Sequence, residues 1–104
     1  MKAAAFSLIV LTLNAVGPRR VHQGWPTRRE AIVSRLKAEA SDAAAFQEVW
    51  RPEDLEALAE GAGHPYRAHN PNLGVAVTTR RPILSWRSLD LGDGYGAKGF
   101  LPRA

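Results

Sequence analysis

Two polar residues follow apolar runs in the first half of the chain, and their types suit metal chemistry. Asn14 ends the run "FSLIVLTLN", and Glu48 ends the run "AAAFQE". If both runs are neighbouring parallel strands, the two side chains emerge at the same edge of a sheet. A carboxylate and an amide oxygen at that edge are the kind of ligands that a hard cation such as Mg²⁺ takes.

The elements that must position these residues have a β-α-β order. We predict strands at Phe6–Leu13 and Ala43–Gln47, separated by a helix at Arg28–Glu39. Thr27 is the expected N-cap of this helix, and Glu30 completes a capping box. Because a crossover of this kind joins parallel strands, the two strands are expected to be adjacent in one sheet.

A second helix is predicted directly after the strand that carries Glu48, in the stretch "RPEDLEALAEG". Pro52 suits the first helical position. Glu53 and Asp54 suit the positive end of the helix dipole. Gly61 or Gly63 can end the helix.

The last part of the chain is expected to add strands to the same sheet. The stretch "HPYRAHNPN" is predicted to be a loop, and strand-like runs follow at Leu73–Thr79 and Ile83–Leu91. A further strand could begin at Lys98–Leu101. The resulting order, β-α-β-α-β-β, indicates a layered α/β domain with helices covering a sheet.

Composition limits the classes of protein that need to be considered. The 104 residues make one domain or part of one, and a hydrophobic fraction of 45% is typical of a globular protein. The chain has no cysteine, which excludes a disulfide framework and a thiol nucleophile. The net charge of +4 favours anionic partners in general but does not by itself indicate nucleic acid.

The first 17 residues allow two interpretations. The stretch "MKAAAFSLIVLTLNAVG" has the charge, apolar run and small residues of a signal peptide. On that interpretation the chain is a small secreted α/β binding or structural protein. We favour the buried strand, and with it a cytoplasmic protein without a membrane span.

Four motifs in order resemble the N-terminal half of the endonuclease/exonuclease/phosphatase superfamily. They are "LTLN", "R…I…L", "D…QEVW…DLEAL" and "NLGVAVTTRRPI", and the resemblance extends from about Leu11 to Leu101. This superfamily contains apurinic endonucleases, DNase I-like nucleases, inositol polyphosphate phosphatases and sphingomyelinases. The resemblance implies one half of a four-layer α/β/β/α sandwich.

The resemblance also implies roles for individual residues. Glu48 matches the ligand of the catalytic divalent metal, usually Mg²⁺, and Asn14 matches a catalytic residue that hydrogen-bonds near the metal or the scissile phosphate. Gly74 and Arg80 match a strand–turn pattern that is mainly structural. The implied reaction is hydrolysis of a phosphate ester, with nucleic acid and phospholipid headgroups among the candidate substrates.

The chain departs from the family pattern in its missing later half. That half supplies catalytic Asp, Asn and His residues, and His22, His64 and His69 match none of those motifs. The sequence is therefore expected to be a partial domain, truncated at its C-terminal side and inactive alone.

Other polar and aromatic residues of the sequence have ordinary explanations. The three histidines are expected in surface loops. The two tryptophans Trp25 and Trp50 are expected to pack against the sheet rather than to stack on a base. Four arginines are expected to be solvated rather than to bind phosphate: Arg19, Arg20, Arg28 and Arg29.

Overall fold

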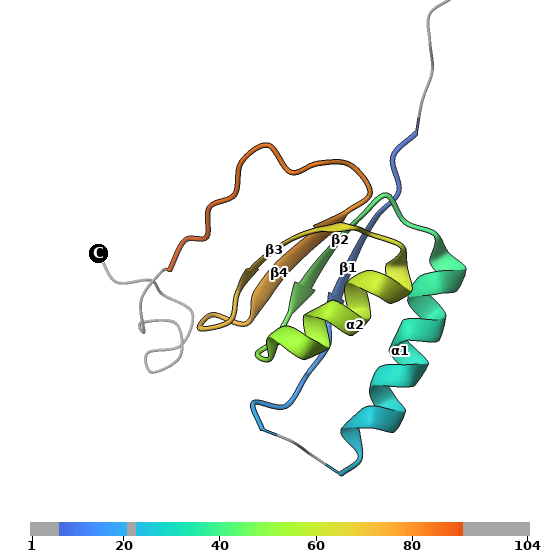
Figure 1. The fold of residues 1–104 in the computed structure, drawn as a ribbon, viewed down its shortest axis with the longest axis vertical. Helices are drawn as coiled ribbons and strands as arrows, with labels where there is room; N and C mark the ends of the chain where they lie inside the picture. Colours follow the sequence, from blue (N-terminus) through green and yellow to red (C-terminus); the bar gives the residue numbers. More distant parts are fainter. Residues whose placement is uncertain (1–6, 21–22, 91–104) are drawn as a thin grey trace, which may run out of the picture.

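The structure, a computed structural model, describes residues 7–20 and 23–90, and in them the chain forms one four-stranded sheet and two helices (Figure 1). Both helices lie on the same face of the sheet, so the α/β class is confirmed. The described residues form two layers, and the four-layer sandwich is not confirmed. The elements in chain order are β1 (Val10–Asn14), α1 (Trp25–Glu39), β2 (Ala43–Gln47), α2 (Pro52–Ala62), β3 (Tyr66–Asn70) and β4 (Val75–Thr79).

The predicted pairing of the first two strands is confirmed. β1 and β2 are parallel neighbours, in register from Val10 opposite Ala43 to Asn14 opposite Gln47. α1 makes the crossover between them, as the β-α-β order predicts. The strand begins at Val10 rather than at Phe6, which lies outside the described residues.

α1 begins earlier than predicted. Its first residue is Trp25, its N-cap is Gly24, and no side chain caps it, so the predicted capping box of Thr27 and Glu30 is wrong. The reason is tertiary: the Trp25 side chain is 3% exposed and its indole Nε1–H donates to Asp54 Oδ1 of α2 at 2.8 Å. This buried contact fixes the first turn without a side-chain cap.

The second half of the sheet differs from the prediction in two places: a strand forms where a loop was predicted, and a predicted strand is absent from residues 83–90. β4 is antiparallel to β2 and forms a hairpin with β3, which occupies part of the predicted loop 64–72. Residues 83–90 of the predicted strand Ile83–Leu91 are not a strand. Since β4 already pairs with β2 on one edge and β3 on the other, the segment after it has no free edge beside β4. The expected strand at Lys98–Leu101 lies outside the described residues.

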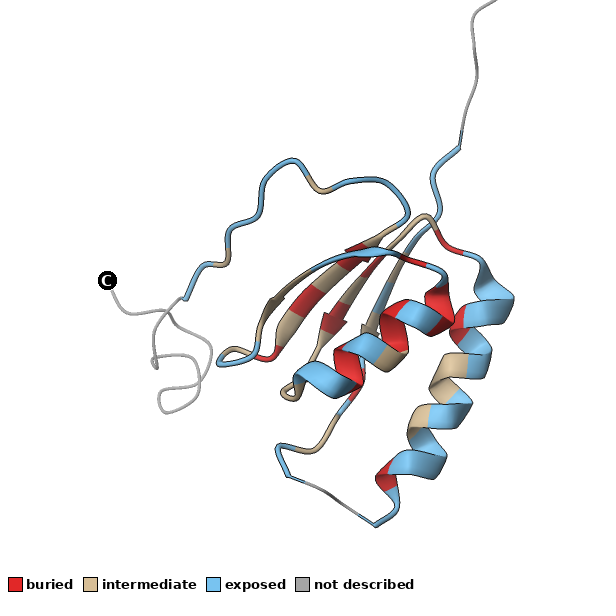
Figure 2. Ribbon diagram, in the orientation of Figure 1, coloured by how far each residue is buried: buried red, intermediate tan, exposed pale blue. Residues whose placement is uncertain are grey.

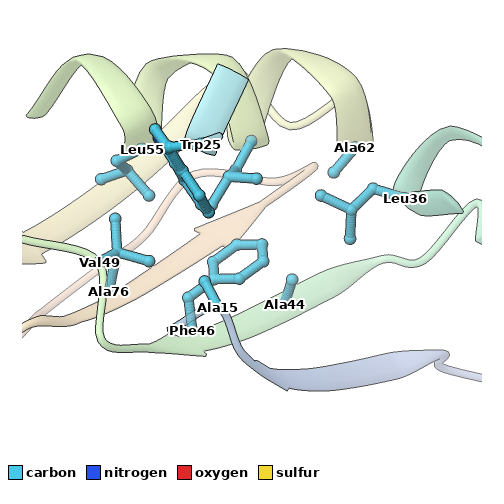
Figure 3. Packing of buried hydrophobic residues seen from close by; sticks show 10 residues of the cluster. Ala15, Trp25, Leu36, Ala44, Phe46, Val49, Leu55, Ala62 and Ala76 are labelled. Carbon is cyan, nitrogen blue, oxygen red and sulfur yellow. The ribbon is translucent and has the colours of Figure 1, made fainter. Parts of the chain in front are cut away.

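The core lies between the sheet and the two helices (Figures 2 and 3). Ala44 and Phe46 alternate along β2 toward the helices, and Leu58 of α2 is fully buried. The alternate residues of β2, which are Ala43, Ala45 and Gln47, are half-buried on the opposite face. One face of the sheet is thus filled by the helices, and the face that carries Thr12 and Gln47 is left more open.

His64 is buried, which contradicts the prediction that it lies in a surface loop. It is 2% exposed, directly after the C-cap Gly63 of α2. Its Nε2 lies 2.8 Å from the Ser41 carbonyl oxygen and its Nδ1 lies 2.7 Å from Thr78 Oγ1. Because a carbonyl only accepts, the Nε2–H donates to Ser41, and Nδ1 is paired with the Thr78 hydroxyl. The ring therefore joins α2, β4 and the α1–β2 turn, which is a structural role.

Candidate active site at the ends of β1 and β2

The two predicted site residues lie at the same edge of the sheet. Asn14 is the last residue of β1 and is opposite Gln47, the last residue of β2. Glu48 follows Gln47, so it is displaced from Asn14 by one residue in register. That their side chains enter one cleft stays a prediction.

The turn after β1 is held by its own side chain and by α1. Asn14 Oδ1 accepts the backbone N–H of Val16 at 3.0 Å. Arg28 of α1 donates one guanidinium N–H to the Ala15 carbonyl at 3.0 Å and another to the Val16 carbonyl. Val16 has φ 48°, a left-handed conformation that is uncommon for a β-branched residue. The Arg28 bonds hold the turn in this conformation.

The turn after β2 is held by three hydrogen bonds to its backbone. The Glu48 carbonyl accepts the N–H of Gly17 at 2.8 Å, which joins the two turns. Val49 donates its N–H to the Gly74 carbonyl at 2.9 Å, and its own carbonyl accepts His69 Nε2–H at 2.8 Å. His69 is therefore half-buried at the end of β3, not in the surface loop that was predicted.

Glu48 has a strained backbone. Its φ is 57°, in the left-handed region that costs a residue other than glycine about 1–2 kcal/mol. Such outliers persist only where surrounding contacts impose them, and they are concentrated at functional sites. The two joined turns each hold one left-handed residue, Val16 and Glu48, beside the predicted site.

Replacing Glu48 by glycine is expected to stabilise the fold by about 0.5–1 kcal/mol, because glycine adopts a positive φ without a Cβ penalty. Urea unfolding measures the change. Ala40→Gly is the matched control, since Ala40 is left-handed with φ 50° at the exposed C-cap of α1. A Glu48→Gly variant that is less stable than the unmodified chain would show that the carboxylate supports the fold and is not spare for a ligand.

The oxygen-bearing side chains at this edge fit part of the coordination shell of a Mg²⁺ ion. Glu48 is half-buried, and no described residue donates a hydrogen bond or forms an ion pair to its carboxylate. Gln47 donates its Nε2–H to Thr12 Oγ1 at 3.2 Å, which places its amide on the same face as Asn14. In residues 7–20 and 23–90 no three His, Cys, Asp or Glu side chains are grouped for a metal ion. One carboxylate still suits Mg²⁺, which keeps several waters and substrate oxygens as ligands.

Sequence reasoning gave Gln47 no role, although its position opposite Asn14 follows from the strand register. The "QE" pair at the end of an apolar strand was the signal that could have identified it. His69 was missed because its strand was taken for a loop.

A separate hollow of about 960 Å³ lies at the opposite end of β2, lined in part by Asp42, Arg80 and Trp86. Its charged groups serve the fold. Asp42 Oδ2 accepts the N–H of Ile9 at 2.8 Å, and Arg80 Nε donates to the Ser41 carbonyl at 2.8 Å. We therefore place the candidate site at Asn14 and Glu48, where the carboxylate has no such structural partner among the described residues.

A scan of the chain against protein-family models gives no match, and a search of curated proteins gives none. The superfamily assignment thus stays a prediction that rests on the order of the motifs. Neither α1 nor α2, the two helices of the described ranges, has the length and apolar character needed to cross a lipid bilayer.

Proposed function

We propose that this chain is the metal-binding part of a Mg²⁺-dependent phosphoester hydrolase of the endonuclease/exonuclease/phosphatase type. Glu48 is the metal ligand, and Asn14 lies beside the scissile phosphate. The observation that carries the proposal is the pair of turns after β1 and β2, which are hydrogen-bonded to each other and hold Glu48 in a strained conformation. Among the described residues, its carboxylate has no hydrogen-bond or ion-pair partner.

The hydrogen bonding of Asn14 gives this residue a specific role. Since the Val16 N–H can only donate, the side-chain atom that it contacts must be the amide oxygen. The amide nitrogen is then left to donate to an anionic oxygen. Asn14 therefore acts as a hydrogen-bond donor to the phosphate rather than as the main metal ligand.

Glu48 supplies the negative charge that holds the cation. When bound, Mg²⁺ stabilises negative charge on the phosphoryl oxygens during attack by water. The turn fixes the backbone from which the carboxylate extends, since the Glu48 carbonyl and both polar backbone groups of Val49 are hydrogen-bonded. This rigidity reduces the cost of ordering the ligand when the metal binds.

The proposal includes a longer domain with a second sheet. Acid–base groups for proton transfer would come from that part, and the second sheet would cover the face opposite the helices. The support is that β1 presents apolar Val10 there at 61% exposure, together with half-buried Ala45 of β2 and Val77 of β4. No helix in the described ranges covers this face.

Binding of Mn²⁺, a paramagnetic substitute for Mg²⁺, tests the metal site directly. In ¹⁵N-labelled protein, Mn²⁺ is expected to broaden the amide signals of residues 14–17 and 47–49 first. Glu48→Gln is expected to raise the Mn²⁺ concentration needed by at least about tenfold, since a hard cation requires the charge. Glu60→Gln, at an exposed carboxylate of α2, is the matched control and should have little effect. Equal broadening in the unmodified and Glu48→Gln chains would refute the ligand assignment.

A further inference from the structure

The structure separates the four arginines between residues 19 and 29 by what their side chains contact. Arg28 is bound to the carbonyls of the turn after β1. Arg29 pairs with the buried Asp54 at 2.8 Å. Arg20 is exposed. The guanidinium carbon of Arg19 lies over the ring of Trp50, 3.8 Å from its centroid.

The contact between Arg19 and Trp50 lies directly beside the candidate site. Gly17 donates its N–H to the Glu48 carbonyl, so the two turns run together at that point. Arg19 comes two residues after Gly17, and Trp50 comes two residues after Glu48. The stacked pair therefore closes the same two turns that carry the proposed metal ligand.

The Trp50 ring is fixed by the backbone below it. A Cβ on Gly74 would lie 2.7 Å from Trp50 Cζ3, so the ring packs against a position where only glycine fits. The Gly74 carbonyl also accepts the N–H of Val49, the residue before Trp50. Gly74 itself has φ 70°, which glycine adopts freely. Trp50 is thus a fixed surface on which the Arg19 guanidinium stacks.

The charge of Arg19 is available for a ligand. No carboxylate in the described residues forms an ion pair with it, whereas Arg29, Arg51 and Arg67 are each paired. A guanidinium that stacks through its face keeps its N–H edge free, and that edge matches the two anionic oxygens of a phosphodiester.

We propose that Arg19, stacked on Trp50, is the phosphate-binding residue of this site, and that the site takes a phosphodiester whose anionic oxygens meet the guanidinium edge. The choice of substrate class rests on the proposed function, but the binding of phosphate by Arg19 does not require the metal. Arg19 also explains how an anion could approach a site whose own ligand, Glu48, is negative.

Titration of the ¹⁵N-labelled chain with dimethyl phosphate tests the proposal, since this diester is not hydrolysed readily and does not precipitate with Mg²⁺. The Arg19 Nε–H and Trp50 indole N–H signals are expected to shift together, without metal. Arg19→Gln is expected to raise the Kd at least about fivefold, as loss of a charge-assisted hydrogen bond does. Arg20→Gln removes the same charge from the adjacent residue and should change the Kd less than about twofold.

Arg19→Lys keeps the charge but loses the planar edge, and it is expected to weaken binding about threefold. Equal weakening by Arg19→Gln and Arg20→Gln, or no shift of the Arg19 signal, would overturn the proposal, because either would indicate a diffuse positive surface. If Arg19→Lys binds dimethyl phosphate as tightly as the unmodified chain does, recognition by the planar edge of the guanidinium is refuted.

Addition of Mg²⁺ separates this proposal from the proposed function. Mg²⁺ is expected to tighten dimethyl phosphate binding in the unmodified chain and not in Glu48→Gln, while the dependence on Arg19 persists in both. If Mg²⁺ has no effect but Arg19→Gln still weakens binding, the proposed metal site is refuted and the proposed phosphate site is supported. If Mg²⁺ acts through Glu48 but Arg19→Gln has no effect, the proposed metal site is supported and the proposed phosphate site is refuted.

Discussion

Glu48→Gln is expected to reduce Mg²⁺-dependent hydrolysis of bis-p-nitrophenyl phosphate to background in a protein that continues through the rest of the domain. Glutamine keeps the shape of the side chain but removes the charge that a hard cation requires. Residues 1–104 alone are expected to show no turnover. On the proposed function the general acid and base lie outside these residues, and the loss of each typically costs about 10²–10⁴-fold in rate.

The assay compares hydrolysis with and without EDTA for the longer protein, its Glu48→Gln variant and residues 1–104. Glu60→Gln controls for the loss of one negative charge elsewhere, since Glu60 is an exposed residue of α2. EDTA-sensitive turnover by residues 1–104 would mean that the chain needs no second half. Full activity of the Glu48→Gln variant would refute the assignment of Glu48 as the metal ligand.

The parts of this fold that were predictable depend on local pattern and on one topological rule. The burial of Ala44 and Phe46 follows from an apolar run between two helices, and the parallel pairing of β1 and β2 follows from the handed β-α-β crossover. The location of Asn14 and Glu48 at one edge follows in turn from that pairing. No side-chain contact had to be known for these steps.

β3 was not predictable by the same route. Pro65 and Pro71 flank Tyr66–Asn70, and its five residues include one arginine and one histidine, which together are typical of a loop. The strand forms because it is at the sheet edge, where proline is tolerated and only one neighbour, β4, must be matched. Arg67 then pairs with Glu56 of α2, a long-range contact that no local pattern contains.

The geometry of the site could not be predicted from the sequence either, because it also depends on long-range contacts. The residue types of Arg19, Arg28 and Arg29 are identical, yet one stacks on an indole, one caps a turn and one meets a buried carboxylate. Likewise the strain at Glu48 is imposed by Gly17, Val49 and their partners rather than by Glu48 itself. Strand order predicts where the site is, whereas tertiary hydrogen bonds decide what each side chain there can do.

Those tertiary bonds make Asp54 the residue that joins the helices to the site. Asp54 is 1% exposed, and its Oδ1 accepts both Trp25 Nε1–H and an Arg29 N–H at 2.8 Å. Its Oδ2 lies 3.7 Å from an Arg51 nitrogen. Trp25 and Arg29 bracket Arg28, the residue that holds the turn after Asn14. Asp54 thus fixes the first turn of α1, and α1 fixes one half of the site.

Asp54→Ala is expected to lower the free energy of unfolding by about 3 kcal/mol, because it leaves the buried indole N–H without its acceptor and removes the carboxylate partner of Arg29. That is a large fraction of the roughly 5–15 kcal/mol that stabilises a typical domain. Urea unfolding measures the loss, and the Val16 amide signal is expected to shift as the Arg28 contact loosens. Glu53→Ala, at a neighbouring carboxylate that is 60% exposed, should cost less than about 0.5 kcal/mol. A loss of less than about 1 kcal/mol for Asp54→Ala would show that α1 is positioned by apolar packing alone, and that the buried carboxylate has no part in shaping the site.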